Sequence, residues 1–154
     1  MKLMHHLLSR LLILLLALIT VDVLWGVFTR YALGHQAGWT EELARFLLIW
    51  IGLLGAAYAS GGRLHLSIDL LEHRLERRSR QRLRVFIAGC VLLFALAVLV
   101  VGGGRLVYLT HILGQRSPAL NLPMAGVYLA LPLSGLLIAA YQLHHLRRPG
   151  AEAL

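Results

Sequence analysis

Residues 30–69 read RYALGHQAGWTEELARFLLIWIGLLGAAYASGGRLHLSID, and charged side chains lie only toward the two ends of this stretch. Residues 46–62 carry no charge and are slightly short for a membrane span, which needs about 20 residues. Starting the helix at Leu43 reaches that length and places Arg45 inside it, near its end. The run is continuous rather than alternating, which excludes a strand of a membrane barrel. The stretch therefore predicts a membrane helix over 43–62 with a polar entrance before it.

Three further apolar runs predict membrane helices over 9–29, 85–108 and 122–143. The chain is 58% hydrophobic and 14% charged, against about 45–50% and about 25% in soluble domains. The first run continues to Thr29 without an Ala-x-Ala-like cleavage site, so we expect a retained helix rather than a signal peptide. The sequence thus predicts an all-α integral membrane protein with one four-helix domain over 1–154.

The loop between the second and third spans fixes the predicted orientation. It holds most of the arginines found outside the apolar runs: Arg63, Arg74, Arg77, Arg78, Arg80, Arg82 and Arg84. Basic loops face the cytoplasm, so both termini should be cytoplasmic. Apolar side chains recur in this loop at helical spacing, at Leu64, Ile68, Leu71 and Leu75. They predict an amphipathic helix over 64–82 in the headgroup plane, with a charged connector as the alternative.

The loop before the fourth span reads GQRSPALNLP (114–123), and its two prolines and one glycine predict a fixed turn. Pro123 should start the fourth helix and Pro132 should kink it. The run of glycines at 102–104 predicts a loosened exit from the third helix.

The polar entrance contains Thr40, Glu41, Glu42 and Arg45. Thr40 is a candidate N-cap, and carboxylates are favourable at a helix N-terminus. Glu41 and Arg45 are four residues apart and can pair. The two glutamates point about 100° apart on a helix, so they do not converge on a substrate. The pattern indicates docking or pairing, and we expect no catalytic residue.

Asp22 is the only charge between Leu11 and Thr29, the apolar run of the first predicted span. A carboxylate at this depth is costly and needs a reason. We predict an intramembrane ion pair between Asp22 and Arg45, which enters from the same side. A coupling-ion site at Asp22 is the alternative.

Small residues follow one face of the second helix at spacings of three and four. They are Gly52, Gly55, Ala56, Ala59 and Ser60. Such a face permits close approach of another helix, from this chain or from a partner.

Other chemistries lack the residues that they need. The single cysteine, Cys90, excludes an intramolecular disulfide. The eight histidines lie at helix ends, in loops or in the tail, so no haem pair is expected. The net charge of +8 is arranged for membrane boundaries and lipid headgroups rather than for nucleic acid. We expect no cofactor and no metal on this chain.

Three motifs together resemble a known family. They are WTEELAR (39–45) with Arg30-Tyr31 before it and Trp50 and Gly55-Ala56 after it, RLHLSID (63–69) and GQRSPALNLP (114–123). They are similar to the small membrane subunit (DctQ-like) of tripartite ATP-independent periplasmic (TRAP) transporters. The resemblance covers about residues 10–145. Matching motif positions make interface or anchor candidates of Arg30, Trp39, Glu41, Glu42, Arg45, Trp50, His65 and Asp69, beside the small residues above.

The resemblance implies a function that the residues alone do not. A small permease subunit would sit in the bacterial inner membrane, bind a large permease subunit and hold that partner as a fixed scaffold. A periplasmic solute-binding protein would touch its outer loops. Sodium would bind the large subunit and drive uptake of organic acids such as dicarboxylates or sugar acids. The alternatives are a self-sufficient four-helix exporter of small cations that uses Asp22, and the small subunit of a tricarboxylate transporter system.

Overall fold

The structure, a computed structural model, describes residues 2–35, 37–61 and 77–147. Four helices in these residues are long and apolar enough to cross a membrane: Leu3–Ala32, Gly38–Gly61, Val85–Ile112 and Met124–His144. The described parts contain no β-strand. The predicted all-α membrane fold with four spans is therefore confirmed.

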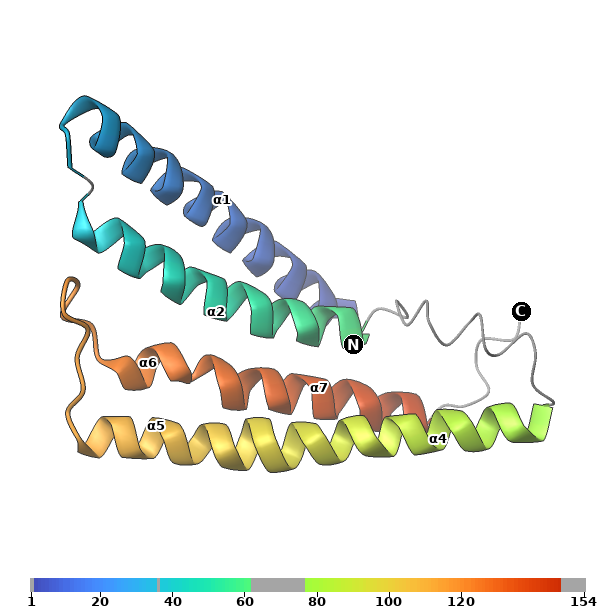
Figure 1. Cartoon of the computed structure of the whole chain (residues 1–154). Coiled ribbons are helices and arrows are strands. Elements are labelled where there is room, and N and C mark those ends of the chain that lie inside the picture. Colours follow the sequence, from blue (N-terminus) through green and yellow to red (C-terminus); the bar gives the residue numbers. More distant parts are fainter. Residues whose placement is uncertain (1, 36, 62–76, 148–154) are drawn as a thin grey trace.

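The described residues form seven helical segments (Figure 1). They are α1 (Lys2–Ala32), α2 (Gly38–Gly61), α4 (Arg77–Phe94), the π-helix η1 (Ala95–Gly102), α5 (Gly103–Ile112), α6 (Met124–Tyr128) and α7 (Ala130–Arg147). The first part of the predicted interfacial helix, 64–76, lies outside the described residues, as do His65 and Asp69. From Arg77 onward the chain belongs to α4, which continues without interruption into the third span.

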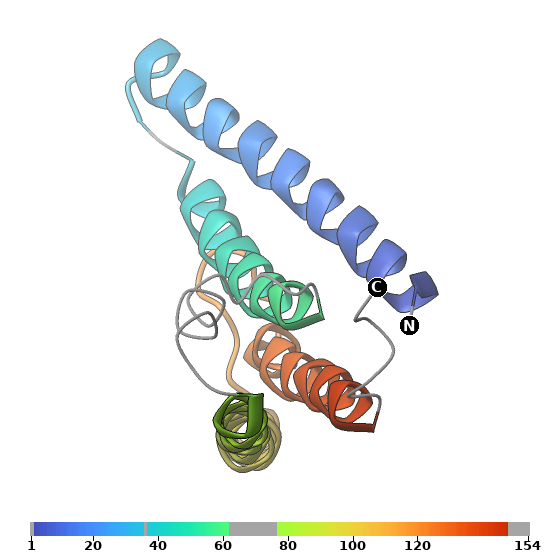
Figure 2. The ribbon, with the colours of Figure 1, turned by 90° about the vertical axis from the view of Figure 1, so that its right-hand side faces the viewer.

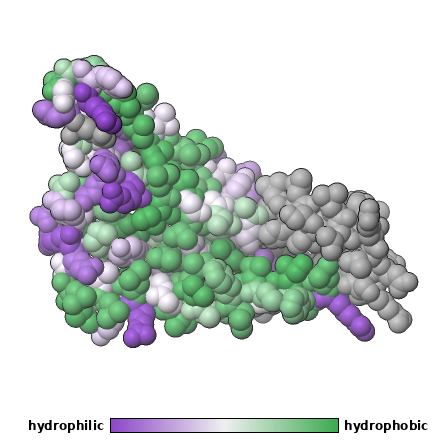
Figure 3. Space-filling model, viewed as in Figure 1, coloured by the Kyte–Doolittle hydropathy of each residue, from purple (hydrophilic) through white to green (hydrophobic). Residues whose placement is uncertain are grey.

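The spans lie in a bent row rather than in a closed bundle. α2 packs between α1 and α7, and α7 packs against α4 and η1 (Figures 1 and 2). The N-terminus of α1, the end of α2, the start of α4 and the end of α7 lie at one end, which we call the His5 end. The opposite end, with the first turn of α2 and the loop 113–123, is called the Glu42 end. Figure 3 shows that hydrophobic side chains cover most of the helix sides and that polar ones gather at the Glu42 end.

The contact of α1 with α2 follows a regular heptad spacing. The less exposed residues of α1 are spaced alternately by four and three: Leu8, Leu12, Leu15, Ile19, Asp22, Gly26 and Thr29. This period of 3.5 residues keeps one seam of a helix against a partner along its whole length. The seam explains why a helix that is apolar all round still buries one defined face. It also places Asp22 inside the protein.

The crossing of α7 over the third span depends on two glycines. A Cβ at Gly103 would lie 2.7 Å from Leu131 Cβ, and one at Gly135 would lie 2.7 Å from Leu99 Cβ. The helix does not loosen at the glycine run 102–104, since it continues as η1 and α5 to Ile112. That prediction was wrong because tertiary packing overrides the weak helix propensity of glycine. Arg105 therefore lies within the helix.

The fourth span is interrupted where proline predicts it. α6 ends at Tyr128, Leu129 separates it from α7, and Pro132 follows three residues later. A proline has no N–H to donate and clashes with the carbonyl four residues earlier, which here belongs to Tyr128. Pro123 lies just before α6, as its N-cap residue, rather than inside it.

Aromatic side chains join three helices at the His5 end. The His5 ring stacks on the Tyr58 ring at a centroid distance of 4.2 Å and meets the Tyr141 ring edge-on at 6.5 Å. Tyr141 lies so close to Gly61 that a Cβ there would be 2.6 Å from the tyrosine ring. Gln142 Nε2 donates a hydrogen bond to Ser60 Oγ at 3.2 Å. These contacts fix the ends of α1, α2 and α7 at a common level.

Alanine substitution at two glycines of the third and fourth spans should have opposite effects. Gly135→Ala should lower the free energy of unfolding by about 1–3 kcal/mol because its methyl group overfills the contact with Leu99. Gly104→Ala meets no atom within 4 Å and should raise stability by up to about 1 kcal/mol through helix propensity. Thermal unfolding of the detergent-purified protein measures both. A stabilising Gly135→Ala would contradict the close crossing.

Candidate functional site

The polar entrance forms the first two turns of α2. The helix begins at Gly38, earlier than the predicted start at 43, so the whole motif from Trp39 to Arg45 is helical. Adjacent positions on a helix diverge by about 100°. Glu41 accordingly faces out of the protein, whereas Glu42 faces the other helices. The two glutamates have separate partners and separate roles.

Glu41 pairs with Arg45 on the exposed side of α2. Arg45 Nη2 lies 3.2 Å from Glu41 Oε1, and both side chains are about two-thirds exposed (66% and 71%). The predicted pair at a spacing of four is confirmed. Exposed pairs of this kind stabilise a helix by only about 0.3–0.5 kcal/mol. The pair is therefore better suited to meeting another surface than to stabilising this fold.

Glu42 is the buried member and holds the loop 113–123 against α2. Its Oε2 atom accepts three hydrogen bonds, from Ser117 Oγ at 2.6 Å, Ala119 N at 3.1 Å and Leu120 N at 2.8 Å. Two of the donors are backbone N–H groups that no other residue of the loop satisfies. Charge-assisted hydrogen bonds of this kind are about twice as strong as neutral ones. Glu42 thus connects residues 75 to 78 positions apart in the chain.

The loop is shaped to present these donors. Ser117 N donates to Leu122 O at 2.9 Å, and Met124 N donates to Gln115 O at 3.0 Å. Gly114 and Asn121 take positive φ values of 60° and 54°, which glycine and asparagine tolerate. The predicted fixed turn is confirmed, and it places three hydrogen-bond donors around one carboxylate oxygen.

Thr40 does not cap α2. It lies in the first turn, is almost fully buried, and donates its hydroxyl hydrogen to Ala37 O at 2.7 Å. The N-cap prediction was wrong because the helix starts at Gly38, two residues before Thr40.

The predicted ion pair between Asp22 and Arg45 does not form. Asp22 is 5% exposed, and neither of its carboxylate oxygens has a hydrogen-bond partner in the described part of the chain. Arg45 binds Glu41 instead, because a partner one turn away on the same helix is reached without ordering a long side chain across a seam. Asp22 lies in the α1–α2 seam beside Gly26, facing away from the exposed side of α2.

Four of the five predicted small residues of α2 are not used for packing inside this chain, whereas the fifth, Ser60, accepts a hydrogen bond from Gln142. Gly52, Ala56 and Ala59 are exposed, and a Cβ at Gly52 or Gly55 would meet no atom within 4 Å. The opposite face of the same helix packs inside the protein through Leu54 and Ala57. We call the exposed face the α2 face, and it consists of Glu41, Arg45, Leu48, Gly52, Gly55, Ala56 and Ala59.

The other predicted interface residues are dispersed. Arg30 is exposed in the last turn of α1, and Trp39 is exposed at the start of α2. Trp50 is half-buried against the core cluster around Leu54. The structure therefore brings Glu41, Arg45 and the small residues together and leaves Arg30, Trp39 and Trp50 apart from them.

The sequence interpretation missed the partners of Glu42. Ser117 was visible within the motif 114–123, but nothing in the sequence connects it to Glu42, and backbone N–H groups carry no residue signature. The arrangement offers hydrogen bonds, one exposed ion pair and a smooth helix face. Within the described residues no group of three His, Cys, Asp or Glu side chains is placed to hold a metal ion.

Comparison with known proteins gives this arrangement a context. Residues 19–150 match the family described as "Tripartite ATP-independent periplasmic transporters, DctQ component". The C4-dicarboxylate TRAP transporter small permease protein DctQ of Rhodobacter capsulatus is 33% identical over 105 residues, 68% of this chain. The sialic acid TRAP transporter small permease protein SiaQ of Vibrio cholerae is 31% identical over 121 residues, covering 75% of this chain and 70% of SiaQ.

A third relative is much longer than this chain. The isethionate TRAP transporter permease protein DctMQ of Oleidesulfovibrio alaskensis is 36% identical over 110 residues, which are 71% of this chain but 17% of DctMQ. The match also spans less than half, 46%, of the Rhodobacter capsulatus protein.

The two neighbouring glutamates should differ sharply in their effect on stability. Glu42→Ala leaves three donors of the loop without an acceptor and should cost about 1–3 kcal/mol for each donor that water cannot reach. Glu41→Ala removes only an exposed pair and should cost at most about 0.5 kcal/mol. Unfolding of the purified chain measures the costs, and limited proteolysis reports release of the loop. Equal effects of the two substitutions would contradict the assigned role of Glu42.

A double-mutant cycle should show no coupling between Asp22 and Arg45. Asp22→Asn keeps the shape of the side chain and breaks no ion pair, so unfolding should change by no more than about 0.5 kcal/mol. Arg45→Ala should have the same effect in either background, within about 0.5 kcal/mol. A coupling energy above about 1 kcal/mol would instead support the pair.

Proposed function

Because this chain belongs to the DctQ component family of tripartite ATP-independent periplasmic (TRAP) transporters, we propose that it is the small permease subunit of a TRAP-type importer and the membrane scaffold of its large permease subunit. The proposed uptake is driven by sodium bound to the large subunit, depends on a periplasmic solute-binding protein and takes up organic acids. The relatives' names give C4-dicarboxylate, isethionate and sialic acid as solutes, all organic anions.

The family also narrows the alternatives. Its members are transporter permease subunits and not enzymes, and the four apolar helices make this chain a multi-pass membrane protein. A self-sufficient cation exporter working through Asp22 has no support among these relatives. The match over residues 19–150 identifies the TRAP family and therefore disfavours the alternative of a tricarboxylate transporter system.

The observation that carries the scaffold proposal is the open α2 face. In a membrane, apolar side chains gain little by leaving lipid, so helices associate through close packing at small residues. This chain follows that rule internally, at Gly61, Gly103 and Gly135. Gly52 and Gly55 are also helix glycines, but a Cβ at either position would meet no atom within 4 Å. The α2 face therefore fits a helix of another protein.

The outer faces of α1 and the third span have a different character. They expose large side chains such as Leu24, Phe28, Phe86 and Phe94, which suit contact with lipid chains. In the most apolar 18-residue stretch of either helix, only 11% is buried inside the protein, against 44% in the corresponding stretch of the fourth span. α1 and the third span thus lie at the two edges of the row, whereas the α2 face combines small residues with the Glu41–Arg45 pair at one end.

A large permease subunit is the partner that the relatives favour. The longer relative DctMQ carries a region like this chain within one permease protein, so the two subunits occur as parts of one polypeptide. The Glu41–Arg45 pair at one end of the α2 face would set the register of the two proteins. The chain would then act mechanically, by holding the immobile part of the partner.

The orientation we propose places the His5 end in the cytoplasm and the protein in the inner membrane. α4 starts at this end with a run of arginines from Arg77 to Arg84, and positive charge of this density marks cytoplasmic loops. The Glu42 end would face the periplasm. Its exposed Arg30, Trp39 and Arg116 would be available to the solute-binding protein.

Filling the α2 face should break the complex without unfolding the chain. Gly52→Leu and Ala56→Leu should reduce co-purification of the co-expressed large permease subunit by tenfold or more, since a loss of about 1.4 kcal/mol already has this effect. Both positions are exposed, so neither substitution should destabilise the isolated chain, and Gly52→Leu should raise its thermal stability slightly through helix propensity. Uptake of a labelled organic acid by liposomes should fall in parallel.

The control is Gly89→Leu, on an exposed side of α4 where a Cβ also meets no atom within 4 Å. It should leave co-purification and uptake unchanged. Loss of the complex with Gly89→Leu but not with Gly52→Leu would move the interface to α4. Uptake by liposomes that contain this chain alone would contradict the scaffold role.

A further inference from the structure

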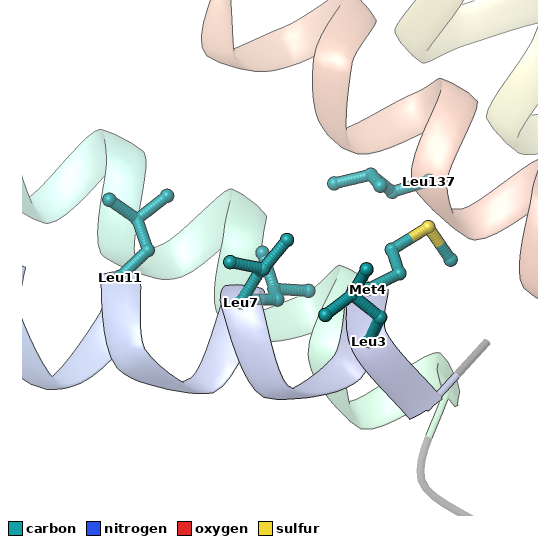
Figure 4. A pocket seen from close by; sticks show the side chains of 6 residues that line it. Leu3, Met4, Leu7, Leu11 and Leu137 are labelled. Carbon is teal, nitrogen blue, oxygen red and sulfur yellow. The ribbon is translucent and has the colours of Figure 1, made fainter.

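An apolar groove lies between α1 and α7 at the His5 end. Its volume is about 320 Å³, which is at the lower limit of known ligand pockets. Figure 4 shows side chains of α1 facing Leu137 of α7 across the gap, with Met4 reaching toward it. The lining residues are Leu3, Met4, Leu7, Leu8, Leu11 and Leu137.

The ring contacts of His5 set the depth of this groove. His5 stacks on Tyr58, near the end of α2, and Tyr141 rests on Gly61 at that end. This level is the boundary of the second span. The groove follows nine residues of α1 across this level, from Leu3 to Leu11, or about 12 Å of helix. It therefore runs from the membrane boundary into the hydrocarbon of one leaflet, as an acyl chain does.

The walls of the groove favour a flexible chain over a protein helix. Close approach of a helix needs glycine, alanine or serine in the contact. Here the lining is entirely leucine and methionine, whose side chains can repack around an irregular apolar ligand. The contrast with the smooth α2 face indicates that the two surfaces have different occupants.

Positive charge lies beside the groove. Arg10 is exposed on α1 between Leu7 and Leu11 and forms no ion pair with any residue that the structure describes. An arginine one or two turns inside a span extends its side chain toward the boundary. His6 is exposed nearer that boundary. A phospholipid whose phosphate lies at the membrane boundary could contact Arg10 through that phosphate, while its acyl chain lies along the leucines of the groove.

We propose that this groove binds one acyl chain of an anionic phospholipid, with Arg10 contacting the phosphate. The assignment to the inner leaflet rests on the orientation proposed above. The lipid would fill the space between the N-terminal half of α1 and α7, which touch only near the His5 end. It would thereby hold α1 in place in the row.

Native mass spectrometry of the purified chain with phosphatidylglycerol and phosphatidylethanolamine tests the site. The wild-type chain should retain one phosphatidylglycerol after other lipids are removed. Leu137→Trp fills the groove and should lose it, whereas Leu136→Trp, on the exposed neighbouring position, should keep it. Arg10→Gln should lower the preference for phosphatidylglycerol by about fivefold, the effect of one basic side chain near an anionic headgroup.

Three outcomes would overturn the proposal: equal retention of the two lipids by the wild type, equal loss in the Leu136→Trp and Leu137→Trp variants, or displacement of the lipid by the large permease subunit with cross-links from Leu7 to it. The first two show annular lipid only, and the third makes the groove a protein interface. The first two outcomes are measured on the chain alone, and only the third needs the large permease subunit. The first two are therefore independent of the Gly52→Leu result, which tests the scaffold.

Discussion

At the Glu42 end, the carboxylate of Glu42 holds the first two spans to the last two. It lies on α2 and takes up two backbone N–H groups and a hydroxyl from the loop that connects the third and fourth spans. A loop at a membrane boundary cannot rely on water for every polar group, and an unpaired group costs several kcal/mol in lipid. One side chain resolves this cost for three donors and fixes where α6 begins. The aromatic contacts of His5, Tyr58 and Tyr141 complete the arrangement at the other end.

Two adjacent glutamates serve opposite purposes because helix geometry separates them. Glu41 forms an exposed ion pair that adds little to stability, whereas the carboxylate of Glu42 accepts hydrogen bonds inside the protein. The sequence motif treats them as one element. Glu42 lies on the inner side of this motif and Glu41 on the outer side. Loss of the Glu42 carboxylate therefore releases the loop 113–123, whereas loss of the Glu41 carboxylate removes only an exposed ion pair. The outer side belongs with the small residues that continue the α2 face.

Local patterns predicted the local structure well. The spans follow from continuous apolar runs, the Glu41–Arg45 pair from a spacing of four, and the turn at 114–123 from its prolines and glycine. The N-cap prediction at Thr40 failed because α2 begins at Gly38, and the other failures involve contacts between distant parts of the chain. Ser117 is 75 residues from Glu42, and Asp22 was assigned to Arg45 because the rotation of α1 against α2 could not be read from composition. The glycine run at 102–104 was misjudged for the same reason, since Leu131 and Pro132 approach from another helix.

The way this chain uses glycine supports a partner at the α2 face. At three close contacts between the described helices a glycine lies at the contact, and a methyl group at Gly61, Gly103 or Gly135 would collide with Tyr141, Leu131 or Leu99. Gly52 and Gly55 weaken α2 by up to about 1 kcal/mol each relative to alanine and give no internal contact in return. A bent row of four helices also has no interior of the kind that a closed bundle has. A second helical protein packed along α2 would provide that interior, and it would explain both the glycines and the shape of the row.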